Sequence, residues 1–459
     1  MADASSRPVV IASNRGPLSF SLVDGEPVGR RGSGGLVSGL APLVESGQAR
    51  WIAAAMSDAD RAAAGDDGIV EADGLTVHML DIDPEVHRRY YDEVSNSTLW
   101  FVHHGLYDLV RSPAFDVGWW EAWESYRQVN AAFADAIVAD APPGATVLVQ
   151  DYHLCLVARR ARVERDDLRF VHFHHTPFAG PDGLRVLPPV VRSELLEGLA
   201  SHDACGFHTK QWESNYRQCQ EAFGGIEGST FAATINSDMD DLRNVARSKA
   251  CETALAELAP VMADRAVIAR VDRMELSKNI VRGFAAYNRL LERRHDLHTK
   301  VVFLACCYPS RLGVEDYRRY HDEVIEAVEA VNERWGTDDW TPVVLMTEDD
   351  FPRSVAVLRS YDVLLVNPIR DGLNLVAKEG PVLNERDGQL VLSTEAGAWT
   401  ELADAADPVF PFDVEATTDT LEAALEREPE QRAFRASELA ESAALRTPQD
   451  WLEDQLRAV

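Results

Sequence analysis

The sequence predicts an α/β protein with two similar domains, each built on a parallel β-sheet. Short buried apolar runs alternate with stretches of helical periodicity, which is typical of parallel strands covered by helices on both faces. The alternation occurs twice, and the segment 224–260, interpreted as a linker region plus one helix, separates the two series. A chain of 459 residues is also too long to fold around one hydrophobic core, so two or three domains are expected.

The first series supplies three buried strands, at 8–14, 146–154 and 168–178. Apolar residues at helical spacing fill the gaps, for example at 120–140 and 190–203. The second series supplies five strands, at 265–272, 299–307, 342–347, 363–368 and 389–394. Ligands of such sheets bind beyond the carboxyl ends of the strands, and we expect the site in a cleft where the two domains face each other.

The composition excludes several classes of protein. The formal net charge is −30, so nucleic acid and anionic membranes, which need basic surface, are not expected as partners. The sequence contains no apolar run of about 18 residues, so no transmembrane helix is expected. The first residues lack the features of a signal peptide. The six cysteines form no CxxC pair, so we interpret them as reduced core thiols of a cytoplasmic protein.

Cations nevertheless gather after one strand. In "RAVIARVDRMELSKNIV", at 265–281, an apolar run is followed by Arg270, Arg273 and Lys278. Arginine offers a planar fork to phosphate and lysine a point charge, so we interpret these three as phosphate-binding. Surface salt bridges are the alternative for this segment taken alone.

A second polar segment follows a later strand, at 366–385. Asp371 comes directly after the strand, and "NLVAKE" opens a helix whose first amides, those of Leu375 and Val376, would point at an anion. Glu379, one turn further, could accept hydrogen bonds from a ribose. An ordinary strand–turn–helix unit is the alternative.

Polar residues also follow the strands of the first domain. The Gly-rich segment 29–40 would let backbone amides approach phosphate, although a simple loop explains it too. Asp151 suits sugar hydroxyls or a helix cap. His172 and His174 share one strand face, and His175 takes the other. Because no partner stands at metal-ligand spacing, no metal is expected and His175 is placed to hydrogen-bond a substrate.

These segments together resemble the retaining trehalose-6-phosphate synthases over about 8–425. The motifs that carry the resemblance, in family order, are "SNRGP", "GSGGLVSGL", "YYDEVSNSTLWFVHH", "QDYHL", "FHHTPF", "VDRMELSKNI", "PSR", "NPIRDGLNLVAKE" and "STEAGAWTEL". The resemblance implies the glycosyltransferase B fold, with two Rossmann-like domains facing across a cleft. It also implies transfer of glucose from a nucleoside diphosphate glucose to glucose 6-phosphate, giving α,α-trehalose 6-phosphate.

The resemblance further implies domain roles. Residues 1–240 would bind the acceptor and 241–430 the nucleotide sugar, and a terminal helix at 431–459 would cross back to the first domain. The donor-binding residues it implies are Gly34, Gly35, Arg273, Lys278, Asp371, Asn374, Leu375, Val376 and Glu379. The acceptor-binding residues it implies are Arg15, Tyr91, Trp100, Asp151 and Arg311. The catalytic residues it implies are Asp151, His175, Arg273, Lys278 and Asp371.

The sequence departs from the family pattern near the donor residues. The usual "RLDYTKG" reads "RMELSKN", which introduces Glu275, Leu276 and Asn279, and Ala54 replaces a tryptophan of the early pocket. Of these departures, Glu275 and Asn279, together with the acidic "TEDDF" at 347–351, favour GDP-glucose over UDP-glucose as donor. Two alternatives stay open: a pseudoglycosyltransferase that joins a nucleotide cyclitol to an amino-cyclitol phosphate, and a non-catalytic protein that senses sugar phosphates.

The expected partners are therefore small molecules, namely a nucleoside diphosphate glucose and glucose 6-phosphate. No cofactor or metal is expected, because the cations and a helix N-terminus would supply the positive field. The sequence leaves homo-oligomerisation open.

Overall fold

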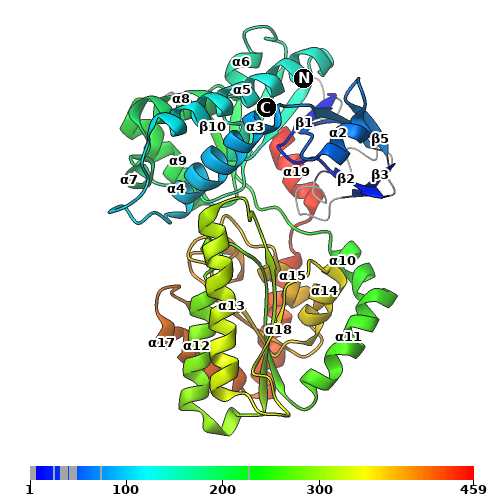
Figure 1. Cartoon of the computed structure of the whole chain (residues 1–459), viewed down its shortest axis with the longest axis vertical. Helices are drawn as coiled ribbons and strands as arrows, with labels where there is room; N and C mark the ends of the chain where they lie inside the picture. The colour runs from blue at the N-terminus through cyan, green and yellow to red at the C-terminus, as the bar shows by residue number, and fades with distance from the viewer. Residues whose placement is uncertain (1–6, 24–25, 32–39, 41–48, 73–74, 226–227) are drawn as a thin grey trace. The chain divides into compact units, whose positions relative to one another are not determined.

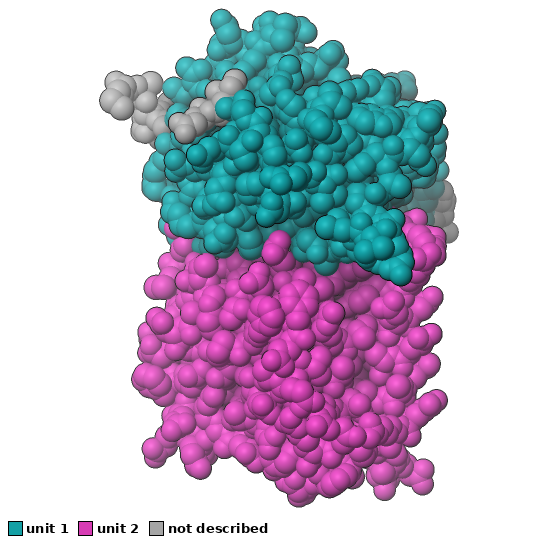
Figure 2. Space-filling model, turned by 90° about the vertical axis from the view of Figure 1, so that its left-hand side faces the viewer, with its two compact units in different colours: residues 1–235, 448–459 teal, residues 236–447 magenta. Residues whose placement is uncertain are grey.

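The computed structural model describes residues 7–23, 26–31, 40, 49–72, 75–225 and 228–459. The chain forms two compact units, shown in different colours in Figure 2. Unit 1 comprises 1–235 and 448–459, and unit 2 comprises 236–447. Both are Rossmann-like α/β units, as the alternation of buried runs and helical patterns predicts.

In the residues that the structure describes, unit 1 is built on an eight-stranded sheet. In spatial order its strands are β10 (Ser229–Ala232), β9 (Ala204–Phe207), β8 (Arg169–His174), β7 (Thr146–Gln150), β1 (Val9–Ala12), β4 (Ala49–Ala54), β6 (Leu75–Leu80) and β5 (Ile69–Ala72). All neighbours are parallel except β5 and β6, and the central strands are buried apolar runs. The strand order reverses between β1 and β7, so the topological switch point of unit 1 lies there.

Helices and a hairpin complete unit 1. They are the hairpin β2 (Leu18–Val23) and β3 (Glu26–Arg31), α2 (Asp58–Ala64), α3 (Pro84–Arg88), the π-helix η2 (Arg89–Leu99), α4 (Trp100–His104), α5 (Val117–Asp140), η3 (Tyr152–Leu154), α6 (Val157–Ala161), α7 (Pro181–Leu184), α8 (Pro189–Ala200), α9 (Lys210–Phe223) and α19 (Pro448–Arg457). The side chain of Asp116 caps α5, whose buried face stacks Trp123 on Tyr126.

The last helix, α19, belongs to unit 1 although unit 2 precedes it in the chain. Its Trp451 ring lies 5.0 Å from the Phe173 ring at the end of β8, and Gln455 accepts a hydrogen bond from Gln150 at 3.3 Å. Figure 1 shows α19, in red, among elements from the first half of the chain.

Unit 2 is built on a six-stranded, entirely parallel sheet. In spatial order its strands are β13 (Val343–Met346), β12 (Val301–Pro309), β11 (Ala266–Met274), β14 (Val363–Val366), β15 (Gln389–Ser393) and β16 (Asp407–Val409). Numbered along the chain, this order is 3-2-1-4-5-6, the arrangement of dinucleotide-binding folds. Its switch point lies between β11 and β14.

The helices of unit 2 form two sets. They are α10 (Met239–Ala246), α11 (Lys249–Met262), η4 (Leu276–Lys278), α12 (Ile280–Arg293), η5 (His295–Leu297), α13 (Glu315–Trp335), α14 (Phe351–Ser360), α15 (Val376–Leu383), α16 (Trp399–Leu402), α17 (Val414–Leu425) and α18 (Pro429–Ala444). Helix α12 packs between α13 and α17, while α14 and α15 pack with α10, and α18 packs on α15 (Figure 1). The apolar face of α12 enters the core through Phe284, Tyr287 and Leu290.

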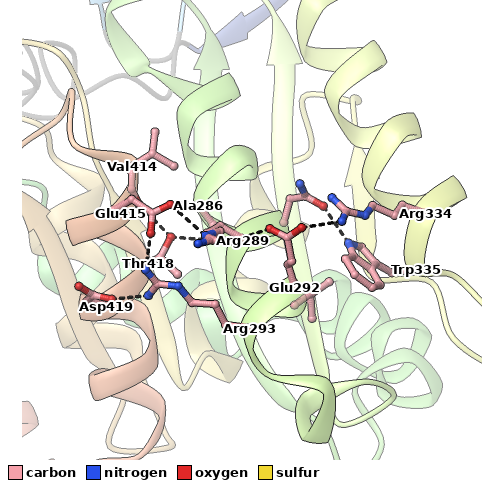
Figure 3. Close-up of polar contacts among 12 residues, drawn as sticks. Ala286, Arg289, Glu292, Arg293, Arg334, Trp335, Val414, Glu415, Thr418 and Asp419 are labelled. Carbon is pink, nitrogen blue, oxygen red and sulfur yellow. Dashed lines mark hydrogen bonds and ion pairs between the residues drawn. The ribbon is translucent and has the colours of Figure 1, made fainter.

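Ion pairs join the outer faces of α12, α13 and α17 (Figure 3). Arg289 donates to Glu415 at 2.9 Å, Arg293 binds both Glu415 and Asp419, and a further pair reaches α13. These side chains are partly exposed, and such pairs each contribute little. We therefore assign the network to surface packing.

Two interpretations of the sequence need correction. The segment 224–260 is more than a linker with one helix, because it contains β10, α10 and α11. Short strands and helices with few apolar residues leave a weak periodic signal. The segment 431–459 holds most of α18 as well as α19, and the two are assigned to different units. All six cysteines are buried without disulfides, as expected. Among the described helices, none is both long and apolar enough to cross a bilayer.

Candidate active site

The predicted donor-binding residues of unit 2 gather at its topological switch point. Arg273 lies near the carboxyl end of β11 and Lys278 lies in η4 just after it, while Asp371 follows β14, the neighbour across which the strand order reverses. Lys278 Nζ donates to Asp371 Oδ2 at 2.7 Å. Ligands of doubly wound sheets bind at this position because loops diverge there and expose the strand ends. The fold thus brings together residues that lie 93 positions apart.

Electrostatics keep Lys278 charged at this place. Burial lowers its pKa, but the attraction of Asp371, with smaller contributions from Asp272 and Glu275, outweighs burial and raises the pKa overall. The two side chains of the Lys278–Asp371 pair are only about 15% and 16% exposed. A partly desolvated ammonium is a strong point charge for an anion.

Asn374 links Asp371 to the start of α15. Its Nδ2 donates to Asp371 Oδ2 at 3.1 Å, and its Oδ1 accepts from the amide of Ala377 at 3.1 Å. The backbone of Asn374 has φ 81°, a left-handed conformation that asparagine tolerates better than most residues. The amides of Leu375 and Val376 stand at the positive end of α15, as predicted from the sequence.

Glu379 is held by a residue that the motifs did not suggest. Ser237 Oγ donates to Glu379 Oε1. Burial raises the pKa of Glu379, and the bond from Ser237 opposes this shift. The carboxyl group predicted for ribose binding is therefore positioned before any ligand arrives. Ser237 stands at the start of unit 2, far from any recognised motif, so sequence reasoning had no signal for it.

Glu275 joins two arginines with different predicted roles. Its Oε1 lies 3.2 Å from Arg273 Nη2 and 3.7 Å from Arg311 Nη1. Arg311 Nη1 also donates to Tyr317 Oη at 2.6 Å. The Glu275 side chain is only 3% exposed, whereas that of Arg273 is half exposed. The arginine predicted for the donor and the one predicted for the acceptor phosphate thus share one carboxylate.

Arg270 does not take the place predicted for it. We expected all three cations after the apolar run to hold phosphate, but Arg270 is fully buried inside β11. Its guanidinium binds Asp272 and backbone and side-chain oxygens of neighbouring loops. The misplacement has a simple cause: β11 extends to Met274, so Arg270 lies within the strand instead of at its end.

In unit 1, Asp151 follows β7 at the switch point. It has φ 69° and ψ 170°, a conformation that is essentially restricted to glycine and costs about 1–3 kcal/mol. Its amide donates to Phe173 O at 2.7 Å, and its Oδ1 accepts from the amide of His175 at 3.1 Å. The Asp151 side chain does not cap the following 3-10 turn, so the alternative role as a helix cap does not hold. Strain of this kind is concentrated at functional sites.

His175 is oriented by Gln150. Its Nε2 lies 3.0 Å from Gln150 Oε1, so Nε2 carries the hydrogen of this contact. Burial lowers the pKa of His175 to about 3, which makes it a neutral imidazole. Trp451 of α19 packs against the ring at 5.7 Å. His172 and His174 share the other face, with Nε2 and Nδ1 3.5 Å apart, as alternation predicts.

Tyr91 lies in the π-helix η2 and is stacked between two imidazoles, His87 and His153, each with its ring centre 5.7 Å away. π-Helical turns are frequent at functional sites. Burial, together with the positive charges of Arg61 and Arg15, lowers the pKa of His87 to about 4. Arg61 thus contributes positive potential near Tyr91, although no motif pointed to it.

The two remaining predicted acceptor residues of unit 1 differ in exposure. Arg15, three residues after the end of β1, is exposed, and its backbone oxygen accepts from Ser13 Oγ at 2.6 Å. Trp100 is buried, with its ring 4.2 Å from that of His104. Gly34 and Gly35 lie outside the residues that the structure describes. Within the described part of the chain, no group of three or more metal-ligating side chains stands together.

Comparisons with known proteins identify the family of the chain. The profile of glycosyltransferase family 20 matches residues 7–459. The trehalose-6-phosphate synthase of Mycolicibacterium smegmatis is 32% identical over 463 residues, which cover 94% of this chain and 89% of that protein. The trehalose-6-phosphate synthase of Mycobacterium leprae is 30% identical over 478 residues, which cover 98% and 94%.

Solved structures give the same result. An α,α-trehalose-phosphate synthase (UDP-forming) from Burkholderia xenovorans, in complex with glucose-6-phosphate, has a TM-score of 0.87 and 26% identity, and covers 98% of this chain and 99% of that chain. An E. coli structure bound with UDP-2-fluoro glucose has a TM-score of 0.85 and 25% identity, with the same coverage. These relatives give no support to the cyclitol-joining and non-catalytic alternatives.

Proposed function

The chain belongs to glycosyltransferase family 20, a family of retaining glycosyltransferases, and we propose that it transfers glucose from a nucleoside diphosphate glucose to glucose 6-phosphate, giving α,α-trehalose 6-phosphate. The observation that carries this proposal is the polar cluster at the switch point of unit 2. There a chain of net charge −30 gathers Lys278, Arg273 and the N-terminus of α15.

In this proposal, unit 2 supplies the donor-binding residues. Lys278 and Arg273 neutralise the diphosphate, and the amides at the start of α15 add hydrogen bonds to it. Asp371 accepts hydrogen bonds from the glucose hydroxyls, and its bond to Asn374 fixes its orientation. Glu379, already held by Ser237, accepts from the ribose.

Unit 1 supplies acceptor-binding residues. Arg15 and Tyr91 bind the phosphate and the sugar of glucose 6-phosphate, while Asp151 and His175 meet the sugars where transfer occurs. A neutral His175 can donate or accept a hydrogen bond without a change of charge. Arg311 of unit 2, held by Tyr317 and Glu275, adds a second cation for the acceptor phosphate.

The proposed chemistry needs no protein nucleophile. The acceptor hydroxyl attacks the anomeric carbon on the face that the diphosphate leaves, which retains the configuration. The bond from the anomeric carbon to the diphosphate oxygen breaks, and a diphosphate oxygen takes the hydroxyl proton. Charge develops on the leaving group, so fixed cations stabilise the transition state more than the ground state. Positioning both substrates supplies the remaining rate enhancement.

For the donor base, we propose a preference for GDP-glucose over UDP-glucose. The N1–H and amino group of guanine are donors, which suit carboxylates. Glu275 binds Arg273 and Arg311, and Asn279 binds main-chain oxygens. These two departures from the family pattern therefore do not favour guanine. Asp350 caps α14, so the carboxylates that remain for guanine are those of Glu348 and Asp349, which are exposed.

One assay tests both levels of the proposal. Purified protein is supplied with glucose 6-phosphate and an equimolar mixture of GDP-glucose and UDP-glucose, and the two released diphosphates are measured separately. Release that requires the acceptor, and that is not supported by free glucose, is expected. A tenfold preference for UDP-glucose would refute the base preference alone, whereas release from neither donor would refute the synthase activity.

A further inference from the structure

Arg270 is the buried centre of the loops that carry the donor-binding residues. Its side chain has no exposed surface, and its Nε donates to Asp272 Oδ2 at 2.9 Å. Its Nη2 donates to the main-chain oxygen of Lys278 at 3.1 Å and also to Asn367 Oδ1. Its Nη1 reaches the oxygen of Ile280 at 3.4 Å. One guanidinium therefore contacts the loop after β11 and the loop after β14.

The same two loops are linked by further bonds. Asn279 Nδ2 donates to the oxygens of Asn367 at 3.0 Å and Pro411 at 2.7 Å, and the amide of Ile369 donates to Ser277 O at 2.7 Å. Arg270 differs from these contacts in binding the main chain of Lys278 itself. The position of the Lys278 backbone, and hence of its ammonium, depends on where this guanidinium lies.

Helix α12 leaves room for the guanidinium at Gly283. A Cβ placed on Gly283 would lie 2.4 Å from Arg270 Nη1 and 3.2 Å from a methyl carbon of Leu365. Carbon and nitrogen cannot approach to 2.4 Å, so any larger residue at 283 must displace the guanidinium. Gly283 lies inside a helix, where glycine is intrinsically less favourable than alanine. The packing of Arg270 explains why position 283 is a glycine.

Fold stability alone is a weak explanation for Arg270. Taking a guanidinium and a carboxylate out of water costs about as much as their attraction returns, so a buried ion pair is poor evidence of a stabilising contact. The pair does fix geometry, because the planar guanidinium donates in several set directions at once. The recipients of those hydrogen bonds are the loops on either side of the switch point.

We propose that Arg270 is a positioning residue that holds Lys278 in place for the diphosphate of the donor, and that Gly283 is glycine to admit it. This inference rests on the proposed function, since it takes Lys278 to bind diphosphate. Arg270 touches no substrate. Its effect reaches the ligand through the Lys278 main chain, and Arg270 and Gly283 act as one unit.

Binding of UDP and of GDP, measured by isothermal titration calorimetry, tests the proposal. The variants are Arg270→Met, Gly283→Ala and Lys278→Ala, with the two doubles Arg270→Met/Gly283→Ala and Arg270→Met/Lys278→Ala. Arg270→Met and Gly283→Ala are each expected to weaken binding about tenfold. Gly283→Ala keeps the arginine and improves helix propensity, so a loss there does not reflect a deleted charge or a weakened helix.

The double variants separate positioning from a general structural effect. Once the guanidinium is absent, the Cβ at 283 has room, so Arg270→Met/Gly283→Ala is expected to bind no worse than Arg270→Met. Once the ammonium is absent, Arg270 has nothing to position, so Arg270→Met is expected to change affinity less than twofold in the Lys278→Ala background. Equal tenfold losses with and without Lys278, or wild-type affinity in Gly283→Ala, would overturn the proposal.

Arg427→Met provides a matched control in the same unit. Arg427 is also mostly buried and binds Asp407 through two nitrogens at 2.8 Å, but it contacts neither loop at the switch point. Its replacement is expected to lower the melting temperature without changing the affinity for UDP or GDP. A loss of affinity in the control equal to that of Arg270→Met would contradict positioning. Failure of the wild-type protein to bind either nucleotide would instead overturn the proposed function, and this inference with it.

Discussion

Lys278 and Asp371 form an ion pair across the switch point of unit 2, with Nζ and Oδ2 2.7 Å apart. Two parallel strands that are neighbours in the sheet bring the residues together, although 93 positions separate them in the sequence. In the proposed function, the pair places a cation for the diphosphate beside a carboxylate for the glucose hydroxyls.

Lys278→Ala is expected to reduce kcat at least 100-fold while the protein stays folded. A charge-assisted contact to the leaving diphosphate strengthens in the transition state, and about 3 kcal/mol corresponds to this factor. Steady-state kinetics at saturating donor, with circular dichroism for the fold, measure both effects. Lys300→Ala, at an exposed lysine of the same unit, serves as the control. Turnover at the wild-type rate in Lys278→Ala would rule out its role.

Arg311→Ala is expected to raise the KM for glucose 6-phosphate at least tenfold and to change the donor KM much less. Arg311 is held by Tyr317 and Glu275, so its guanidinium is already oriented for a phosphate. Initial rates with each substrate varied in turn provide the comparison. The control Arg318→Ala removes an exposed arginine that pairs with Glu315. An equal rise in both KM values would show that Arg311 does not discriminate between the substrates.

Stability is expected to fall as pH decreases from 7.5 to 5. Burial lowers the pKa of His103 to about 3 and that of His202 to about 4, and lowers the pKa of His172 and His174 well below the usual value. Below pH 6.5 these histidines bind protons in the unfolded chain but stay neutral in the folded protein. The free energy of unfolding therefore falls as the pH decreases from 6.5 to 5. At pH 5 each such histidine costs about 2 kcal/mol.

Urea unfolding at pH 7.5 and pH 5 measures this loss. Few carboxylates titrate between these values, because their ordinary pKa values lie lower, so histidines dominate the change. A midpoint that is the same at both pH values would show that the buried imidazoles are protonated in the folded protein.

Activity is expected to survive an excess of EDTA. The positive field at the diphosphate comes from Lys278, Arg273 and the start of α15, and the described residues contain no cluster of metal ligands. Rates before and after chelation, at fixed ionic strength, provide the measurement. Full loss of activity that one added divalent metal restores would mean that the charge balance is misassigned.

The sequence was sufficient to predict the fold class and the strand ends where polar residues gather. The reason is physical: buried parallel strands leave continuous apolar runs, and their carboxyl ends follow directly in the chain. The runs at 146–154 and 363–368 contain β7 and β14. Short strands such as β9 and β10 left no comparable run and were missed.

Side-chain partners were harder to predict. The role of Arg270 depends on the length of β11 and on space beside Gly283, neither of which is visible in a local pattern. Glu275 is one of the departures that favour GDP-glucose in the sequence, but its partners in space, Arg273 and Arg311, cannot be identified from a local pattern. Tertiary packing decides such contacts, and motif spacing does not.

The central claim is tested most directly by the product of the wild-type enzyme. Purified protein is incubated with glucose 6-phosphate and a nucleoside diphosphate glucose in the presence of EDTA, and the product is identified by mass spectrometry and proton NMR. One disaccharide monophosphate is expected, whose two anomeric protons both show α couplings. A product with a β linkage, or hydrolysis of the donor to free glucose with no disaccharide phosphate, would contradict it.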